Sequence, residues 1–103
     1  MAYNLIITND ANDELDKIVD YIAVNLQNTK AASDFLDQVD SSYDLLIDNP
    51  RIYQLCDYPA FKEKQYRKVV INNYIMIYKI DEATNTVNVM HFFYGQRDYY
   101  NLI

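Results

Sequence analysis

The chain of 103 residues has one glycine, one cysteine, one histidine and no tryptophan. A single glycine excludes the glycine-rich loops that hold phosphates in nucleotide-binding proteins. One histidine and one cysteine, with no carboxylate pair at ligand spacing near either, disfavour a zinc site. No serine or cysteine lies in the sequence context of a catalytic triad. We therefore expect no metal and no cofactor.

Long apolar runs are also absent. No segment approaches the roughly 18 apolar residues that a membrane-spanning helix needs. The N-terminus, Met1 to Asn4, has neither the basic region nor the cleavage pattern of a secretory signal. Cys56 has no partner for an internal disulfide, which fits a reducing compartment. These features favour a cytoplasmic protein, and the length predicts one domain over residues 1–103.

Charge is distributed unevenly along the chain. The formal net charge is -6, with a pI near 4.4. Up to Pro50 there are ten acidic residues against Lys17 and Lys30, whereas from Arg51 onward seven basic residues stand against five acidic ones. The net charge alone argues against nucleic-acid binding, which depends on cations that neutralise phosphates. An ordinary solvated helical surface explains the acid as well as a binding surface does.

The first half of the chain predicts a strand and two helices. A β-rich run at 3–8 precedes Asn9 and Asp10, which are good helix-capping residues. The stretch 25–28 separates the two helices, and Thr29 is a candidate cap for the second. Two helices with so short a link pack as an antiparallel hairpin. Apolar residues recur at helical spacing at Leu15, Ile18, Val19, Ile22 and Leu26, and again at Ala32, Phe35, Leu36, Val39, Tyr43 and Leu46.

The second half predicts three strands. The connection 51–64 is expected to be irregular, with a short strand near Tyr53 to Leu55. Asn72-Asn73 suits a two-residue hairpin turn, because asparagine tolerates positive φ. Both faces of the middle strand are largely apolar, which predicts helices on one face and partial cover on the other. The order β-α-α-β-β-β indicates an α+β fold, with the helix hairpin packed on a mostly antiparallel sheet. The β-rich runs lie at 66–71, 74–80 and 87–94.

Most candidate functional side chains lie in or after these strands. Guanidinium, ammonium and phenol groups on a sheet can hold a phosphodiester and stabilise transition-state charge, and His91 can transfer a proton. Plainer interpretations are a half-buried strand histidine, an ion pair of Arg97 with Asp98, and tyrosines that serve an interface rather than base stacking. The candidates are Arg67, Lys68, Lys79, His91, Tyr94, Arg97, Tyr99 and Tyr100.

The chain resembles the RelE/ParE superfamily of toxins from bacterial type II toxin–antitoxin modules. The resemblance covers nearly the whole chain, and the last two of four segments contribute most to it. It implies a growth-inhibiting toxin, of a kind that stabilises plasmids, neutralised by a cognate antitoxin encoded nearby. The segments are ANDELDKIVDYI, LLIDNP, YRKVVINNYIMIYKIDE and VNVMHFFYGQRDY.

The superfamily divides by target. RelE-like members are ribosome-dependent mRNA endonucleases, whereas ParE-like members inhibit DNA gyrase without nuclease activity. RelE-like enzymes have an arginine after the tyrosine of the central strand, but Ile75 follows Tyr74 here. Their phenol near the C-terminus has no clear counterpart, because Ile103 falls close to its place, although Arg97 matches a second family arginine. The strand segments follow the ParE-like pattern more closely, which implies a toxin that binds gyrase.

Three interpretations follow, and each assigns the candidates differently. A ParE-like toxin would bind its target with Arg67, Lys68, Lys79, Tyr94, Arg97 and Tyr99. A RelE-like endoribonuclease, acting on mRNA at the ribosome, would use Arg67, Lys68, His91 and Arg97. A degenerate, non-toxic module would serve a repressor complex and reach DNA only through its antitoxin.

The net charge of -6 departs from the usually basic toxins of this superfamily. A ribosomal RNA surface is difficult to reconcile with that charge. The acidic helices can instead bind a basic segment of the antitoxin.

Overall fold

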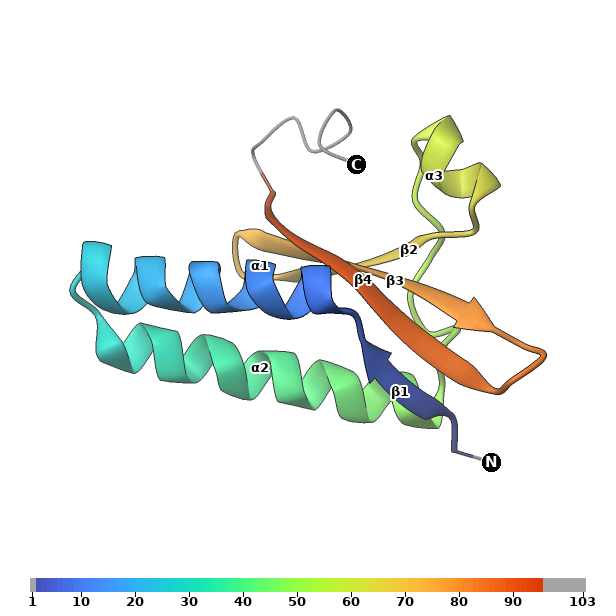
Figure 1. Cartoon of the computed structure of the whole chain (residues 1–103), viewed down its shortest axis with the longest axis horizontal. Coiled ribbons are helices and arrows are strands. Elements are labelled where there is room, and N and C mark those ends of the chain that lie inside the picture. The colour runs from blue at the N-terminus through green and yellow to red at the C-terminus, as the bar shows by residue number, and fades with distance from the viewer. Residues whose placement is uncertain (1, 96–103) are drawn as a thin grey trace.

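The computed structural model describes residues 2–95. Two long helices lie side by side on one face of a four-stranded sheet, and a short helix stands apart from them (Figure 1). The α+β class and the predicted order are confirmed, with a short third helix and a π-helical turn added. The elements are β1 (Asn4–Ile7), α1 (Asn9–Asp20), η1 (Tyr21–Asn25), α2 (Thr29–Asp48), α3 (Pro59–Glu63), β2 (Arg67–Ile71), β3 (Tyr74–Asp81) and β4 (Thr86–Tyr94).

The sheet has the strand order β1-β4-β3-β2. β1 pairs with β4 in parallel, whereas the β2–β3 and β3–β4 pairs are antiparallel, so the sheet is mostly antiparallel as predicted. Ile71 pairs with Tyr74 across a two-residue turn, and Asn72 has a φ of 55°. This confirms the predicted hairpin, in which asparagine accepts a left-handed backbone.

The two long helices begin slightly earlier than their predicted caps indicate, by one or two residues for α1 and by one residue for α2. Thr8, rather than Asn9 or Asp10, caps α1, and its hydroxyl accepts a hydrogen bond from the backbone N–H three residues later. Asn28, rather than Thr29, caps α2 in the same way. The difference has a simple cause, because a cap lies just outside the helix and its side-chain oxygen must reach an N–H of the first turn.

The larger hydrophobic core lies between the sheet and the helices. Phe35 of α2 is 1% exposed, and its ring centroid is 5.1 Å from that of Tyr74. Met76 and Tyr78 point to the same side of β3 and are fully buried there. The phenol of Tyr78 donates a 2.7 Å hydrogen bond to the carbonyl of Pro50, so its buried hydroxyl is satisfied. The helix layer that the sequence predicts over one face of the central strand is thus confirmed.

A second, smaller core lies on the opposite face, which we call the open face. Ile75 and Ile77 of β3 pack there with Phe61 of α3 and with neighbouring residues of the connection and β4. α3 follows from local sequence, because Pro59 at its first turn has a fixed φ suited to a helix start. Partial cover of this face, as the sequence predicted, comes from α3 and its flanks.

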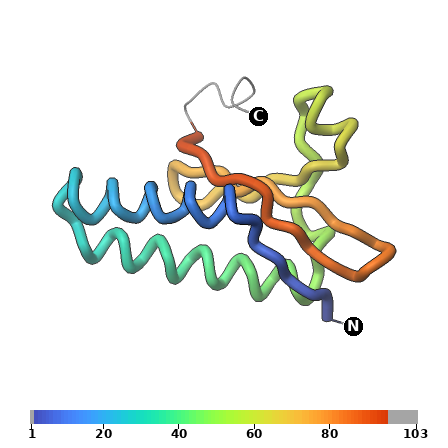
Figure 2. The backbone as a smooth tube through the Cα atoms, in the orientation of Figure 1, coloured from blue at the N-terminus to red at the C-terminus, as the bar shows by residue number. Residues whose placement is uncertain are grey.

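The connection between α2 and β2 is more ordered than the sequence indicates. The strand expected near Tyr53 to Leu55 is reduced to one bridge between Leu55 and Arg67. α3 occupies the later part of the connection and projects away from the helix pair, as the backbone trace shows (Figure 2). The reason is packing: Phe61 gains burial only if the chain folds back over the sheet. Within residues 2–95, no helix is long and apolar enough to cross a membrane.

Candidate binding surfaces

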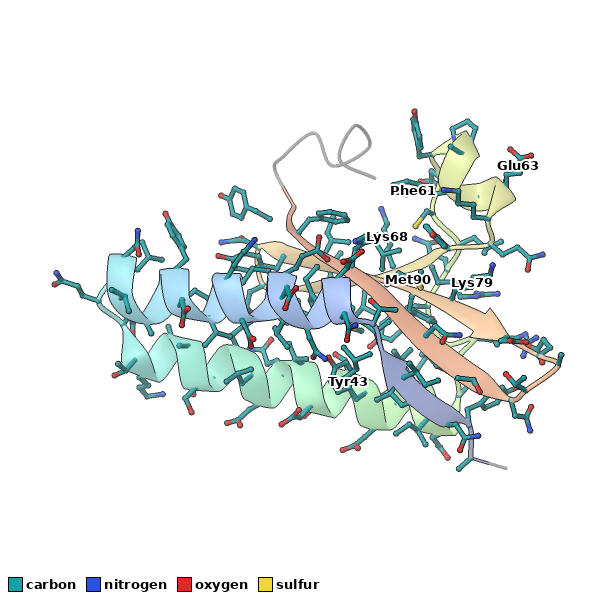
Figure 3. All side chains as sticks on the ribbon, viewed as in Figure 1. Tyr43, Phe61, Glu63, Lys68, Lys79 and Met90 are labelled. Atoms are coloured by element: carbon teal, nitrogen blue, oxygen red, sulfur yellow. The ribbon has the colours of Figure 1, made fainter. Side chains whose placement is uncertain are left out.

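Two of the predicted cations lie on the open face. Side chains alternate between the two faces along a strand. In β2, Val69 and Ile71 belong to the helix-side core, so Lys68, which directly precedes Val69, lies on the open face. In β3, Tyr78 belongs to the helix-side core, so Lys79 also lies on the open face (Figure 3). These two lysines can reach a partner that approaches from the side opposite the helices.

Arg67 lies on the other face. It is half-buried at the start of β2, and its Nη1 donates a 2.6 Å hydrogen bond to the carbonyl of Tyr53. It also lines a small cavity of about 170 Å³ beside the ion pair of Arg51 with Glu82. The guanidinium therefore holds the connection against the sheet. Alternation places Arg67 and Lys68 on opposite faces, a signal that the sequence already contains.

His91 is bound to a carboxylate that sequence reasoning missed. Its Nδ1 lies 3.1 Å from Oε1 of Glu14 in α1, and the same oxygen accepts a 3.3 Å hydrogen bond from the backbone N–H of Phe92. The imidazole is 15% exposed and stacks at 5.5 Å on the ring of Phe93. His91 therefore links a helix to the sheet, and 77 residues separate it from Glu14, too far for a sequence pattern to reveal.

The end of β1 explains why a helix residue bonds to β4. β1 pairs with β4 only as far as Val89, so no other strand among residues 2–95 borders the rest of this edge of β4. Thr8 donates its hydroxyl to the carbonyl of Met90 at 3.3 Å, and Glu14 accepts from Phe92. Side chains at the start of α1 thus replace the missing strand, which leaves fewer unpaired backbone groups at the edge.

An open groove of about 930 Å³ lies between α1–η1, the β2–β3 turn and the end of β4. We call it the aromatic groove. Tyr21 and Leu26 on its helical side are 48% and 55% exposed, and Tyr94 on the strand side is 38% exposed. The rings of Tyr94 and Tyr74 meet at 5.6 Å, nearly edge to face. Among the predicted residues that the structure describes, only Tyr94 lines it. Exposed aromatic side chains around a concave surface are typical of protein-binding sites.

Gly95 closes the described chain beside the β2–β3 turn. Its N–H donates a 2.7 Å hydrogen bond to the carbonyl of Asn73, and a Cβ on Gly95 would meet that oxygen at 3.1 Å. The glycine thus permits a close approach that holds the strand side of the aromatic groove. The predicted residues Arg97, Tyr99 and Tyr100 lie outside the described residues, as does the predicted pair of Arg97 with Asp98.

The thiol of Cys56 belongs to the smaller core. It is 3% exposed, and burial raises its pKa, an effect that the ammonium of Lys68 partly offsets. The thiol therefore stays protonated at neutral pH and is a poor nucleophile. Residues 2–95 contain no group of three histidine, cysteine, aspartate or glutamate side chains placed to hold a metal ion.

The sequence matches the family model of the ParE toxin of type II toxin–antitoxin systems over residues 5–99. The chain belongs to this family. The match spans the helix pair, both faces of the sheet and the aromatic groove. No curated protein matches the sequence.

Solved toxin structures share the fold at low sequence identity. A mutant of E. coli RelE in the free state has a TM-score of 0.69 at 18% identity, and the match covers 99% of this chain and 93% of that one. The toxin–antitoxin complex RelBE of E. coli has a TM-score of 0.62 at 18% identity, covering 93% and 100%. The complex RelBE2 of Mycobacterium tuberculosis has a TM-score of 0.59 at 16% identity, covering 91% and 99%. The resemblance to the RelE/ParE superfamily is thereby confirmed.

Proposed function

We propose that this toxin arrests growth by binding DNA gyrase, without cutting nucleic acid, and that a cognate antitoxin neutralises it. Three observations support the proposal: the residue at position 75, the separation of the predicted catalytic groups, and the chemistry of the aromatic groove.

Ile75 is the observation that carries the proposal. The resemblance implies an arginine here in RelE-like nucleases, whereas this side chain is 7% exposed and packs in the smaller core with Ile77 and Phe93. A guanidinium at this place would need to be buried among apolar groups, which is costly without a partner. The central strand thus offers hydrocarbon where a nuclease would present a cation to the scissile phosphate.

Arg67, Lys68 and His91 are the described groups of the nuclease interpretation, and Arg67 lies on the opposite face of the sheet from Lys68. Arg67 bonds to the backbone on the helix side, Lys68 lies on the open face, and His91 is bound by Glu14. Phosphodiester cleavage needs its acid, base and cation around one phosphate, because most of the rate enhancement comes from orientation and placed charge. A dispersed set of cations supports binding rather than cleavage.

The aromatic groove fits an amphipathic segment of the antitoxin. Two solved relatives are toxin–antitoxin complexes. Here the groove combines exposed aromatic rings with Glu14 and Lys17 in its lining, on a helix layer rich in acid. An amphipathic helix could place apolar side chains in such a groove and basic ones beside the acid. The partner expected from this chemistry is a helical segment with a basic flank.

Expression in a bacterial host and a supercoiling assay test the gyrase proposal together. Induction of the wild-type chain should stop growth and activate the DNA-damage response, and coexpression of the adjacent antitoxin frame should restore growth. The purified toxin should inhibit supercoiling of relaxed plasmid by gyrase. Normal plasmid topology in arrested cells, with an uninhibited enzyme in vitro, would refute the target.

The runner-up is an mRNA endonuclease, and the bond between His91 and Glu14 is the observation that favours it. A carboxylate on Nδ1 orients an imidazole for proton transfer at Nε2. Mapping of mRNA ends in a reconstituted translation reaction decides between the two. New ends that require ribosomes would establish the nuclease, and harmless expression without antitoxin would instead indicate the non-toxic repressor module.

A further inference from the structure

Basic residues gather in one short stretch of an otherwise acidic chain. Residues 57–68 contain four of the nine lysines and arginines, with only Asp57 and Glu63 against them. The helix half has ten acidic residues and two lysines. The chain therefore concentrates positive charge around α3, on the side of the sheet away from the acidic helices.

Three of these cations belong to α3, to the residue just after it, or to the open face of the sheet. Lys62 in α3 and Lys64 just after it are exposed, and Lys68 is half-buried on the open face. None of them forms an ion pair within residues 2–95, whereas Lys30 is paired with Asp34. We call Lys62, Lys64 and Lys68 the lysine platform.

The smaller core holds the lysine platform in place. Phe61 is 1% exposed, and its ring lies 5.4 Å from that of Tyr58 and 5.6 Å from that of Tyr66. The ammonium of Lys64 lies 5.7 Å above the ring of Tyr66, within the range of a cation–π contact. Figure 3 shows Phe61 and Glu63 on the projecting α3, with Lys68 closer to the middle of the sheet. Phe61 thus packs α3 onto the smaller core, while the lysines of α3 and its flank remain at the surface.

We propose that the lysine platform binds an acidic segment of the protein target. The inference rests on the proposed function, because it names the chemistry of the target surface. Charge complementarity identifies the occupant. Three cations that form no ion pair with a described residue, beside the carboxylates of Asp57 and Glu63, match a short run of aspartate or glutamate. They fall short of the many phosphate contacts that a nucleic acid needs, particularly on a chain of net charge -6.

Two variants with the same net charge isolate the effect of position. Lys62→Glu/Lys64→Glu reverses the charge of two platform residues. Lys17→Glu/Lys30→Glu reverses the charge of two lysines on the helices. The probe is a fluorescein-labelled peptide of ten glutamates, measured by anisotropy at low salt. We expect the platform variant to bind at least tenfold more weakly than wild type and the helix variant to remain within about threefold. Circular dichroism melts check that both variants are folded.

Equal weakening in both variants would overturn the proposal, as would tighter binding of a ten-residue oligothymidylate than of the peptide. Growth assays separate this inference from the proposed function. If wild type arrests growth, the platform variant should not, yet it should still copurify with the antitoxin. If the platform variant still arrested growth as strongly as wild type, the proposed role of the lysine platform in target binding would be wrong. A third outcome is that wild-type expression is harmless but the platform variant still binds the peptide more weakly than the helix variant. That result would reject the toxin function and support the lysine platform as a binding site.

Discussion

The two faces of the sheet differ in what covers them and in what they expose. The helix face is sealed by α1 and α2, with Phe35, Met76 and Tyr78 almost fully buried beneath them. The open face has a smaller core beneath α3, and Lys68 and Lys79 stand beside it. The same alternation along β3 supplies both cores, yet one stabilises the domain and the other positions a surface.

The comparison also explains the charge of the molecule. Acid lies on the helix layer, and Lys62, Lys64 and Lys68 lie on the side of α3, so the net value of -6 averages two regions of different charge. A negatively charged surface favours a basic partner, and a positively charged surface favours an acidic one. We expect a basic antitoxin segment on the helix side and an acidic target segment on the open face.

The largest effect should come from the helix-side core. Phe35→Ala removes a ring that is 1% exposed and packed on Tyr74. We expect a loss of about 3–5 kcal/mol in the free energy of unfolding, because the cavity cannot close between a helix and a sheet. Urea denaturation measures the loss. A change below about 1 kcal/mol would show that α2 does not depend on this contact.

Phe61→Ala tests the open face in the same way. Its ring is as deeply buried as that of Phe35, but α3 is only five residues long and can detach locally. We expect the free energy of unfolding to fall by about 3 kcal/mol, which is the lower end of the range for replacing a buried phenylalanine with alanine. Hydrogen exchange should accelerate in α3 and spare α2. Uniform acceleration throughout the protein would mean that the two cores are one cooperative unit.

Alkaline pH should weaken the helix-side core through its buried phenols. Burial raises the pKa of Tyr78 to about 12, and likewise that of Tyr43. The unfolded chain loses these protons near pH 10, so stability is complete below pH 10 and declines as pH rises towards 12. For Tyr78 the decline amounts to about 2–3 kcal/mol. Denaturation midpoints between pH 9 and 12 measure it.

Phenylalanine variants separate the two tyrosines. Tyr43 has a buried hydroxyl with no hydrogen-bond partner among the described residues, whereas Tyr78 donates to Pro50. Tyr43→Phe should reduce the alkaline decline and leave stability at pH 7 unchanged or slightly higher. Tyr78→Phe should reduce the decline but cost about 1–3 kcal/mol at pH 7, because the carbonyl loses its donor. Identical behaviour of the two variants would contradict this assignment.

The smallest effect should come from the link between α1 and the edge of β4. Glu14→Ala leaves the N–H of Phe92 and Nδ1 of His91 without this acceptor. We expect a loss of about 1–2 kcal/mol, reduced in Glu14→Gln, which keeps an acceptor oxygen. Asp13→Ala on the exposed side of α1 is the matched control. Equal losses in Glu14→Ala and Asp13→Ala would show that only helix charge matters.

Local pattern predicted most of the fold. Helical spacing placed α1 and α2, and the turn at Asn72-Asn73 separated β2 from β3. The alternation in β3 predicted a layer on each face. The same rule, applied to β2, would have placed Arg67 and Lys68 on opposite faces. α3 escaped prediction because a five-residue helix with one apolar anchor has no periodicity to detect.

The amino-acid sequence by itself determined the strands, the helix pair and the uneven charge, because each depends on residues close together in the chain. Tertiary structure alone decided that Glu14 meets His91, that Tyr21 and Tyr94 line one groove, and that Phe61 fixes the lysine platform. Such contacts join residues far apart in sequence. Their geometry is set by how the layers pack, which periodicity does not encode.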